Sequence, residues 1–296
     1  MLRSILLYLS QQQALRRWME TSALARPLTR RFVAGETLEE AVAACRAIHR
    51  EGMAVALDHL GENVTTAVES QASLVESLKA VREIADQRLR ATVSIKLTQF
   101  GLDLDTAFCR ENVAPLVAAA RQAGTGVEVD MESSGYVDRT LAIVEDLHGR
   151  YGCVRAVIQA YLYRSEEDIR RLCAARIPVR LCKGAYREPP SVAFPAKAQV
   201  DENYLRLGRV LLTAGIDPAL ATHDERMLAL VRGLSPDRFE IQMLYGVRRD
   251  LQRRLVAEGY RVRLYLPYGE AWYPYLMRRL AERPANLWFV LRSLAS

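Results

Sequence analysis

The 296-residue chain is predicted to fold as a (β/α)8 barrel of the TIM type, with some distortion and with a helical arm before it. From residue 53 onward, short β-rich runs alternate with longer amphipathic runs, as in a parallel sheet whose strands are joined by helices. Eight such pairs follow one another without a low-complexity linker, which favours a closed barrel. The glycine fingerprint of a dinucleotide-binding sheet is absent, because Gly124 and Gly126 precede a strand and no third glycine completes GxGxxG.

Residues 1–50 form the predicted arm. Two apolar-periodic stretches, 4–18 and 38–49, flank a proline-containing connector at 25–35. We expect the arm to pack on the catalytic barrel, which would occupy residues 51–296 within a single domain overall. The arm carries no catalytic signal of its own.

The barrel elements are predicted in chain order. The strands are expected at 53–58, 92–97, 126–131, 155–160, 177–183, 218–223, 238–243 and 262–266. The helices between them are expected at 67–86, 106–123, 138–149, 166–175, 196–214, 225–233 and 247–258. A Pro-Tyr-Gly turn at 267–269 then leads to a last helix ending near Glu282, with Pro274 tolerated in its first turn.

Composition narrows the function classes. Half of the residues are hydrophobic, yet no apolar run approaches the roughly 20 residues of a spanning helix, and the N-terminus is a poor signal peptide. Five cysteines without a CxxC pair indicate free thiols in a reducing compartment, and no metal site is predicted. The net charge of +6 suits an anionic ligand or an acidic membrane surface.

Polar residues stand at the ends of the predicted strands, where the active site of a barrel gathers. For any one position a helix cap or a local pair is the simpler explanation, but the pattern recurs around the whole barrel. The sequence therefore predicts an enzyme site, or at least a ligand site, in a polar mouth. Its members are Asp58, His59, Lys96, Asp130, Gln159, Arg180, Lys183, Thr222, His223, Gln242 and Tyr265.

The last helix adds a second cluster. Tyr275, Arg278, Arg279 and Glu282 fall at i, i+3, i+4 and i+7, which places them on one helical face. Two guanidinium groups can grip a small carboxylate bidentately, and a neighbouring glutamate can orient one of them. Spacing alone leaves a solvated face with one salt bridge equally open.

Cations dominate the predicted mouth, with Lys96 and Arg180 at strand ends and two arginines on the last helix. They imply an anionic substrate, an anionic cofactor, or both. No Cys/His cluster has metal-ligand spacing, and no nucleophile stands beside a base. This inventory fits redox chemistry that a bound cofactor supplies.

Seven motifs carry a resemblance that spans nearly all of the chain after Lys96. They are SIKLTQFGL (94–102), VEVDMES (127–133), IQAYLYRS (158–165), VRLCKGAY (179–186), ATHDE (221–225), FEIQMLYGV (239–247) and RLYLPYGEAWYPYLMRRLAERPAN (263–286). In these motifs and their order, the sequence resembles the proline dehydrogenase family, FAD-dependent barrel enzymes of proline catabolism. We expect the short monofunctional bacterial form, with no aldehyde dehydrogenase domain after the barrel and no DNA-binding segment before it.

The resemblance implies oxidation of L-proline to Δ1-pyrroline-5-carboxylate by hydride transfer to FAD, with a membrane quinone reoxidising the flavin. Pyrroline-5-carboxylate dehydrogenase would consume the product, and nucleic acid is not an expected partner. The expected location is the cytoplasm, with peripheral contact at the inner face of the cytoplasmic membrane.

The resemblance also assigns roles within the substrate site. Arg278 and Arg279 would clamp the proline carboxylate, with Lys96 as a third cation. Glu282 would hold Arg279, while two tyrosines would pack against the pyrrolidine ring: Tyr265 and Tyr275.

Catalytic and cofactor roles follow in the same way. Arg180 would sit beside the isoalloxazine ring, and Asp130 would be the acidic partner of Lys96 and Tyr265. The implied FAD contacts are Met131, Gln159, Arg180, Cys182, Lys183, Gly184, Thr222 and His223.

One segment departs from the family pattern. After VRLCKGAY the chain reads REPPSVAF, where many relatives carry a tryptophan and acidic residues, so the contacts of this loop with cofactor or substrate stay open. Two alternatives also stay open. One is another flavin-dependent barrel oxidoreductase for a related small cyclic amino acid, which the pocket around Leu264 and Tyr265 would decide. The other is a non-catalytic basic protein that binds nucleic acid or acidic lipid.

Overall fold

The computed structural model describes residues 26–61 and 64–282, and for residues 26–28 and 278–282 it describes the backbone alone. Eight parallel strands form a closed barrel in sequence order, and β8 pairs with β1 to close it. The (β/α)8 prediction is therefore confirmed. The strands are β1 (Ala54–His59), β2 (Ala91–Ile95), β3 (Val127–Val129), β4 (Val154–Gln159), β5 (Val179–Cys182), β6 (Ala219–Ala221), β7 (Glu240–Leu244) and β8 (Val262–Tyr268).

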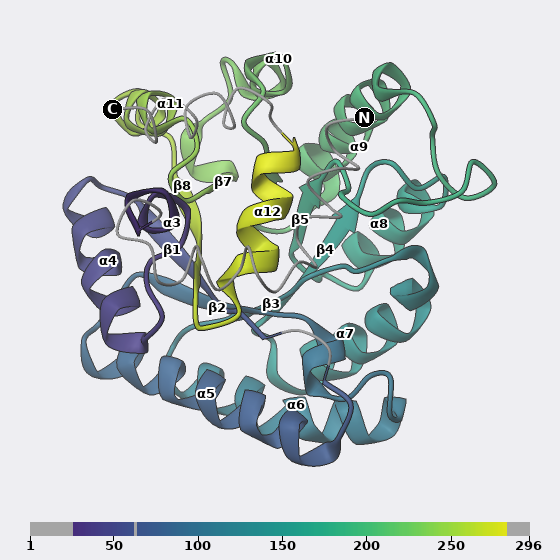
Figure 1. The fold of residues 1–296 in the computed structure, drawn as a ribbon. Helices are drawn as coiled ribbons and strands as arrows, with labels where there is room; N and C mark the ends of the chain where they lie inside the picture. Colours follow the sequence, from purple (N-terminus) through teal and green to yellow (C-terminus); the bar gives the residue numbers. More distant parts are fainter. Residues whose placement is uncertain (1–25, 62–63, 283–296) are drawn as a thin grey trace.

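Helices surround the strands as a ring, and α12 is seen inside this ring, over the strands (Figure 1). The α-helices are α3 (Arg26–Phe32), α4 (Leu38–Arg50), α5 (Ala67–Asp86), α6 (Thr106–Gln122), α7 (Val137–Tyr151), α8 (Ser165–Ala174), α9 (Lys197–Ala214), α10 (Glu225–Leu228), α11 (Arg249–Ala257) and α12 (Trp272–Glu282). Short 3-10 turns are η1 (Leu97–Phe100), η2 (Ser134–Tyr136), η3 (Ala229–Val231) and η4 (Pro236–Arg238).

Local sequence explains where the first barrel helices begin. Thr37 and Thr66 each form a capping box with the glutamate three residues later, and Asp105 accepts a hydrogen bond from the N–H of Phe108. Such caps satisfy N–H groups that the first helical turn leaves without an intrahelical partner. Outward strand residues such as Val55 and Leu57 then pack under the helices in one apolar layer.

Several boundaries shift by a few residues, and three segments differ from prediction in the kind of structure they form. The segment predicted as a connector at 25–35 contains helix α3, because a proline in the first helical turn loses no hydrogen bond. Pro267 and Tyr268 extend β8 and are not part of a turn, since β8 stays paired with β1 up to Tyr268. The helix predicted at 225–233 is a single turn, α10, followed by η3. The helix predicted at 4–18 lies outside the described residues.

The lumen is polar, whereas barrel interiors are usually filled by branched apolar side chains. Residues on opposite strands hydrogen-bond across it, as Gln242 on β7 does with Glu128 on β3. Because strand side chains alternate between two faces, every second residue of these strands contributes to the polar column. Its members include Thr92, Ser94, Glu128, Arg180, Glu240, Gln242 and Arg263.

The segment before β1 is hydrogen-bonded to the end of β8 and to the segment that follows it. The N–H of Ala34 donates to the carbonyl of Pro267 at 2.9 Å, and the N–H of Gly269 donates to Gly35 at 3.0 Å. The indole of Trp272 donates to Glu36 at 3.0 Å. Around these bonds, an apolar cluster joins the end of α3 to α12, with Phe32, Val33, Leu60, Val247, Trp272, Tyr273, Tyr275, Leu276 and Met277. The division into an arm at 1–50 and a barrel at 51–296 stays a prediction.

Within the described ranges, no helix combines the length and the apolar character needed to cross a bilayer. All five cysteines are free thiols, as predicted.

The contact between Gly246 and α3 gives a stability prediction. A Cβ at Gly246 would lie 1.7 Å from the carbonyl oxygen of Arg31, and the φ of Gly246 is +75°. Gly246→Ala should therefore lower the free energy of unfolding by about 3 kcal/mol, through backbone strain and steric overlap together. Urea denaturation measures this loss.

Gly259→Ala is the matched control, because Gly259 has φ +86° and open space where a Cβ would go. It should cost only about 1 kcal/mol, the strain of a left-handed alanine. Equal losses in the two variants would show that the α3 contact contributes nothing.

Candidate functional site

A hydrogen-bonded cluster occupies the mouth at the C-terminal ends of β1, β2, β3 and β8. The ammonium of Lys96 lies 3.3 Å from Asp58, 3.5 Å from Asp130 and 3.3 Å from the hydroxyl of Tyr265. The Tyr265 hydroxyl in turn donates to Asp130 at 2.6 Å. The structure thus brings together four residues of the predicted mouth, Asp58, Lys96, Asp130 and Tyr265.

Tyr265 stays a neutral phenol in this cluster. Burial and the negative charge of Asp58 raise the pKa of Tyr265 well above its usual value. A neutral hydroxyl can accept from Lys96 and donate to Asp130 at the same time. Tyr265 therefore fixes the distance between the cation and the carboxylate at the mouth.

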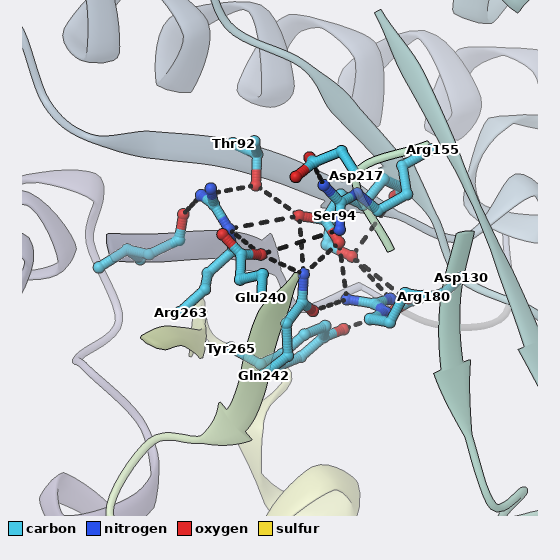
Figure 2. A network of polar contacts seen from close by, with 12 residues as sticks. Thr92, Ser94, Asp130, Arg155, Arg180, Asp217, Glu240, Gln242, Arg263 and Tyr265 are labelled. Atoms are coloured by element: carbon cyan, nitrogen blue, oxygen red, sulfur yellow. Dashed lines mark hydrogen bonds and ion pairs between the residues drawn. The ribbon is translucent and has the colours of Figure 1, made fainter. Parts of the chain in front are cut away.

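Arg180 lies one layer below, nearly fully buried. Its Nη1 donates to the carbonyl oxygen of Gln242 at 3.1 Å and pairs with Glu128 at 3.3 Å. Its Nη2 contacts Asp130 and lies 3.5 Å from the hydroxyl of Ser94. The guanidinium carbon also lies 5.5 Å from the centre of the Tyr265 ring. Figure 2 shows this cation at one side of the lumen network, beside Asp130, which Tyr265 also contacts.

The lowest layer is a set of ion pairs around Glu128 and Glu240. Arg263 lies 2.8 Å from Glu240 and 3.7 Å from Glu128, and Gln242 donates to both carboxylates at 2.9 Å. Arg155 joins Glu240 to Asp217 at the N-terminal ends of the strands. Burial alone would raise the pKa of Glu128, but the surrounding guanidinium groups outweigh it and hold that pKa well below its usual range.

A second group of polar residues stands at the ends of β4, β5 and β6. Lys183 pairs with Asp201 and, at 3.4 Å, with Asp224. Gln159 donates to the carbonyl of Glu132 at 2.7 Å, and Nε2 of His223 accepts from the N–H of Leu244 at 2.9 Å. Thr222 is buried, and its hydroxyl accepts from the N–H that follows two residues later. These side chains form a donor-rich rim beside the Lys96 cluster.

Three further predicted cofactor residues are placed by packing. Met131 is buried in the main core, and burial raises the pKa of the Cys182 thiol. Gly184 has φ +108°, and a Cβ there would lie 2.3 Å from the ring of Tyr161. The close approach that the structure shows at Gly184 is therefore to this ring.

The loop at 187–194, which departs from the family pattern, is held in place by hydrogen bonds. The carboxylate of Glu188 accepts from the N–H and the hydroxyl of Ser134, both at 2.6 Å. Tyr163 donates from its hydroxyl to Pro190 at 2.9 Å and from its N–H to Val192 at 3.1 Å. The loop therefore lies against the ends of β3 and β4, at the edge of the donor-rich rim.

Helix α12 brings Tyr275 to the mouth. Tyr275 is buried in the apolar cluster against which Tyr265 also packs. By helical spacing, Arg278, Arg279 and Glu282 follow Tyr275 on one side of α12. Their side chains lie outside the described residues, so the carboxylate clamp stays a prediction.

Of three buried acids that the structure places in or beside the site, sequence reasoning put Asp58 in the mouth without a specific role and missed Glu128 and Glu132. Asp58 pairs with Lys96, Glu128 pairs with Arg180, and Glu132 accepts from the hydroxyl of Thr98 at 2.6 Å. Burial raises the pKa of Glu132. The period-two pattern of Glu128 and Asp130 was the available signal, because it places two acids on one face of a strand.

Away from the mouth, the described part of the chain has a further cavity but no metal-ligand cluster. In residues 26–61 and 64–282, no three His, Cys, Asp or Glu side chains are grouped to hold a metal ion. A cavity of about 650 Å³ opens at the N-terminal ends of β2 to β5. Three of its four lining arginines are engaged: Arg90 with backbone carbonyls, Arg155 with Asp217 and Arg263 with Glu240.

Comparisons with known proteins agree with this geometry. The family described as proline dehydrogenase matches residues 41–292. Proline dehydrogenase 1 of Bacillus subtilis is 39% identical over 99% of both chains, and proline dehydrogenase of Deinococcus radiodurans is 42% identical over 90% of both. Among solved structures, proline utilization A (PutA) of Bdellovibrio bacteriovorus, inactivated by N-propargylglycine, superposes with a TM-score of 0.82 at 27% identity. The match covers 87% of this chain and 33% of that one.

Opposite pKa shifts at Glu128 and Glu132 give a pH prediction. The lowered pKa of Glu128 means that its charge stabilises the fold above the unfolded-state pKa near 4.5, and that this stability is lost as the pH falls through the folded-state value. Glu128→Gln should lower the free energy of unfolding by about 3 kcal/mol at pH 7, because it leaves buried arginines uncompensated. The loss should shrink below about pH 4.

Glu132→Gln should behave in the opposite way. A raised folded-state pKa means that full stability is present below the unfolded-state pKa and is lost as the pH rises through the folded-state value. The free energy of unfolding of Glu132→Gln, taken relative to that of the parent, should therefore be higher at pH 7 than at pH 4. Urea titrations at both pH values measure the two differences, and equal pH trends for the two variants would contradict the assignment.

Proposed function

Because the chain belongs to the proline dehydrogenase family, we propose that it oxidises L-proline to Δ1-pyrroline-5-carboxylate with FAD as the hydride acceptor. The observation that carries this proposal is the mouth cluster, in which Lys96, Asp130 and Tyr265 form one hydrogen-bonded unit above buried Arg180. Such a unit offers a cation for an anionic substrate, and it has no metal ligand set or activated nucleophile to suggest hydrolysis.

The donor-rich rim suits FAD. Lys183 is a partly exposed cation held between Asp201 and Asp224, so a phosphate oxygen could replace a carboxylate as its partner. Gln159, Thr222 and His223 stand on the neighbouring strand ends and add polar groups, while Met131, Cys182 and Gly184 supply close apolar or backbone contact. FAD bound there would accept the two electrons and the hydrogen of a hydride from the substrate.

The residues of the chain would bind and orient proline. We assign the substrate carboxylate to Lys96, Arg278 and Arg279, with Glu282 holding the last of these. Tyr265 and Tyr275, which share one apolar cluster, would pack against the ring. Holding the reacting carbon at a fixed distance and angle removes much of the entropic part of the barrier.

Charge then assists the chemistry in two ways. Cations around the substrate favour loss of the proton from its amine, which must leave before a hydride can. Arg180, held by Asp130 and Glu128, would be a fixed cation beside the flavin ring and would favour the electron-rich reduced state. We therefore assign Asp130 and Arg180 to catalysis.

We also propose that a membrane quinone reoxidises the flavin and that pyrroline-5-carboxylate dehydrogenase consumes the product. We further propose a location in the cytoplasm, in peripheral contact with the inner face of the cytoplasmic membrane. A net charge of +6 supports attraction to anionic lipid.

The protein should sediment with anionic phospholipid vesicles at low salt and stay in the supernatant with neutral ones. Failure to sediment with anionic vesicles would remove the membrane contact from the proposal.

Colour tests the proposed reaction. The freshly purified protein should be yellow, and anaerobic addition of L-proline should bleach its visible flavin absorbance, because the hydride passes to FAD. A stopped-flow spectrophotometer records the rate. Faster bleaching by the six-membered ring homologue at equal concentration would instead favour an oxidoreductase for a related cyclic amino acid.

Arg278→Ala tests the carboxylate clamp. Losing a charge-assisted hydrogen bond of about 1.5–3 kcal/mol should raise KM for proline roughly 10- to 100-fold while FAD stays bound. Steady-state kinetics with a soluble quinone measure this change. Arg253→Ala is the matched control, because Arg253 is an exposed arginine on α11 paired with Glu51. An unchanged KM in Arg278→Ala would remove that residue from the clamp.

A further inference from the structure

Deep in the lumen, Glu128 stands behind Arg180. Its Oε2 lies 3.3 Å from Nη1 of Arg180, and its side chain is 2% exposed. Asp130, two residues further along the chain and just past the end of β3, contacts Nη2 of the same guanidinium. Residues i and i+2 of extended chain share one face, so these two carboxylates contact the two terminal nitrogens of one arginine.

Gln242 forms a second link between Arg180 and Glu128. Its carbonyl oxygen accepts from Arg180 at 3.1 Å, and its amide nitrogen donates to Glu128 at 2.9 Å. A guanidinium can only donate and an ionised carboxylate can only accept, so the amide fits in a single orientation. Arg180 is thereby held from below through a direct ion pair and through a glutamine bridge.

We propose that Glu128 is a positioning residue that fixes the orientation of Arg180 and partly neutralises its charge, and so sets how easily the bound FAD is reduced. The inference rests on the proposed function, since it needs FAD beside Arg180. A reduced flavin carries more negative charge, which a nearby cation stabilises and a buried counter-ion opposes. Removing the charge of Glu128 should therefore make FAD easier to reduce.

Glu240 offers the matched control. It is buried in the same column, and its carboxylate lies 2.8 Å from Arg263 and 3.8 Å from Arg155. It reaches Arg180 indirectly, through the amide of Gln242 or through Arg263 and Glu128. Glu240→Gln and Glu128→Gln remove the same charge with the same change of shape, but only Glu128→Gln removes a direct contact with Arg180. A purely structural role for Glu128 predicts equal effects on FAD.

The experiment measures the midpoint potential of FAD in three purified holoenzymes: parent, Glu128→Gln and Glu240→Gln. Each is reduced slowly and anaerobically by xanthine and xanthine oxidase with a reference dye, and both absorbances are followed. In Glu128→Gln the equilibrium between oxidised and reduced FAD should shift about tenfold toward the reduced form, a rise of about 30 mV for a two-electron couple. Glu240→Gln should shift it less than threefold.

Either of two results would overturn the proposal. One is a midpoint potential of FAD in Glu128→Gln that is equal to or lower than that of the parent, and the other is a rise in Glu240→Gln as large as that in Glu128→Gln. If Glu128→Gln does not fold or does not retain FAD, Glu128→Asp replaces it, because aspartate keeps the buried charge and withdraws it from Arg180 by one methylene. Its potential should rise by a smaller amount, and a potential equal to that of the parent would then overturn the proposal.

Failure of this inference can be told apart from failure of the proposed function. If the parent protein is colourless, or if L-proline leaves its flavin oxidised, the proposed function fails. If the parent bleaches with proline while the Glu128→Gln potential equals that of the parent, only the role of Glu128 fails.

Discussion

Pairing of buried charge is the constraint on which this structure depends. An isolated ion in a protein interior is costly, so a lumen that contains Arg180, Arg263, Glu128 and Glu240 is stable only if each has a partner at close range. Two of the pairs, Arg180 with Glu128 and Arg263 with Glu128, join strands that are not neighbours, so the pairing fixes side chains across the barrel as well as along it. The site at the mouth inherits this rigidity through Asp130.

The layered order of the network separates two tasks. At the bottom, the acids and arginines neutralise one another and join opposite strands. At the top, Lys96 is partly exposed and shares its charge among Asp58, Asp130 and Tyr265. A substrate anion arriving there meets a cation that is already oriented, so little reorganisation accompanies binding. Arg180 stands between the layers and couples them.

Much of this was predictable from sequence. Alternating β-rich and helical runs identified the barrel, because that periodicity follows directly from strand and helix geometry. Polar strand ends identified Lys96, Asp130 and Tyr265, because parallel strands end at one mouth. The pairing of Arg180 with Glu128 and Gln242 was not predictable, since these side chains approach one another only after the barrel closes. Helix α3 was missed because a proline in a first turn reads equally well as a loop.

Closure of β8 on β1 has a consequence for how the chain is made. Their pairing joins residues 54–59 to residues 263–268, so the barrel cannot close until the chain up to residue 268 has left the ribosome. Until then β1 presents an open edge, the kind of surface on which nascent chains aggregate. The charged inward faces of β3, β5 and β7 oppose such association, since an incomplete barrel would expose ionised groups and not an apolar surface.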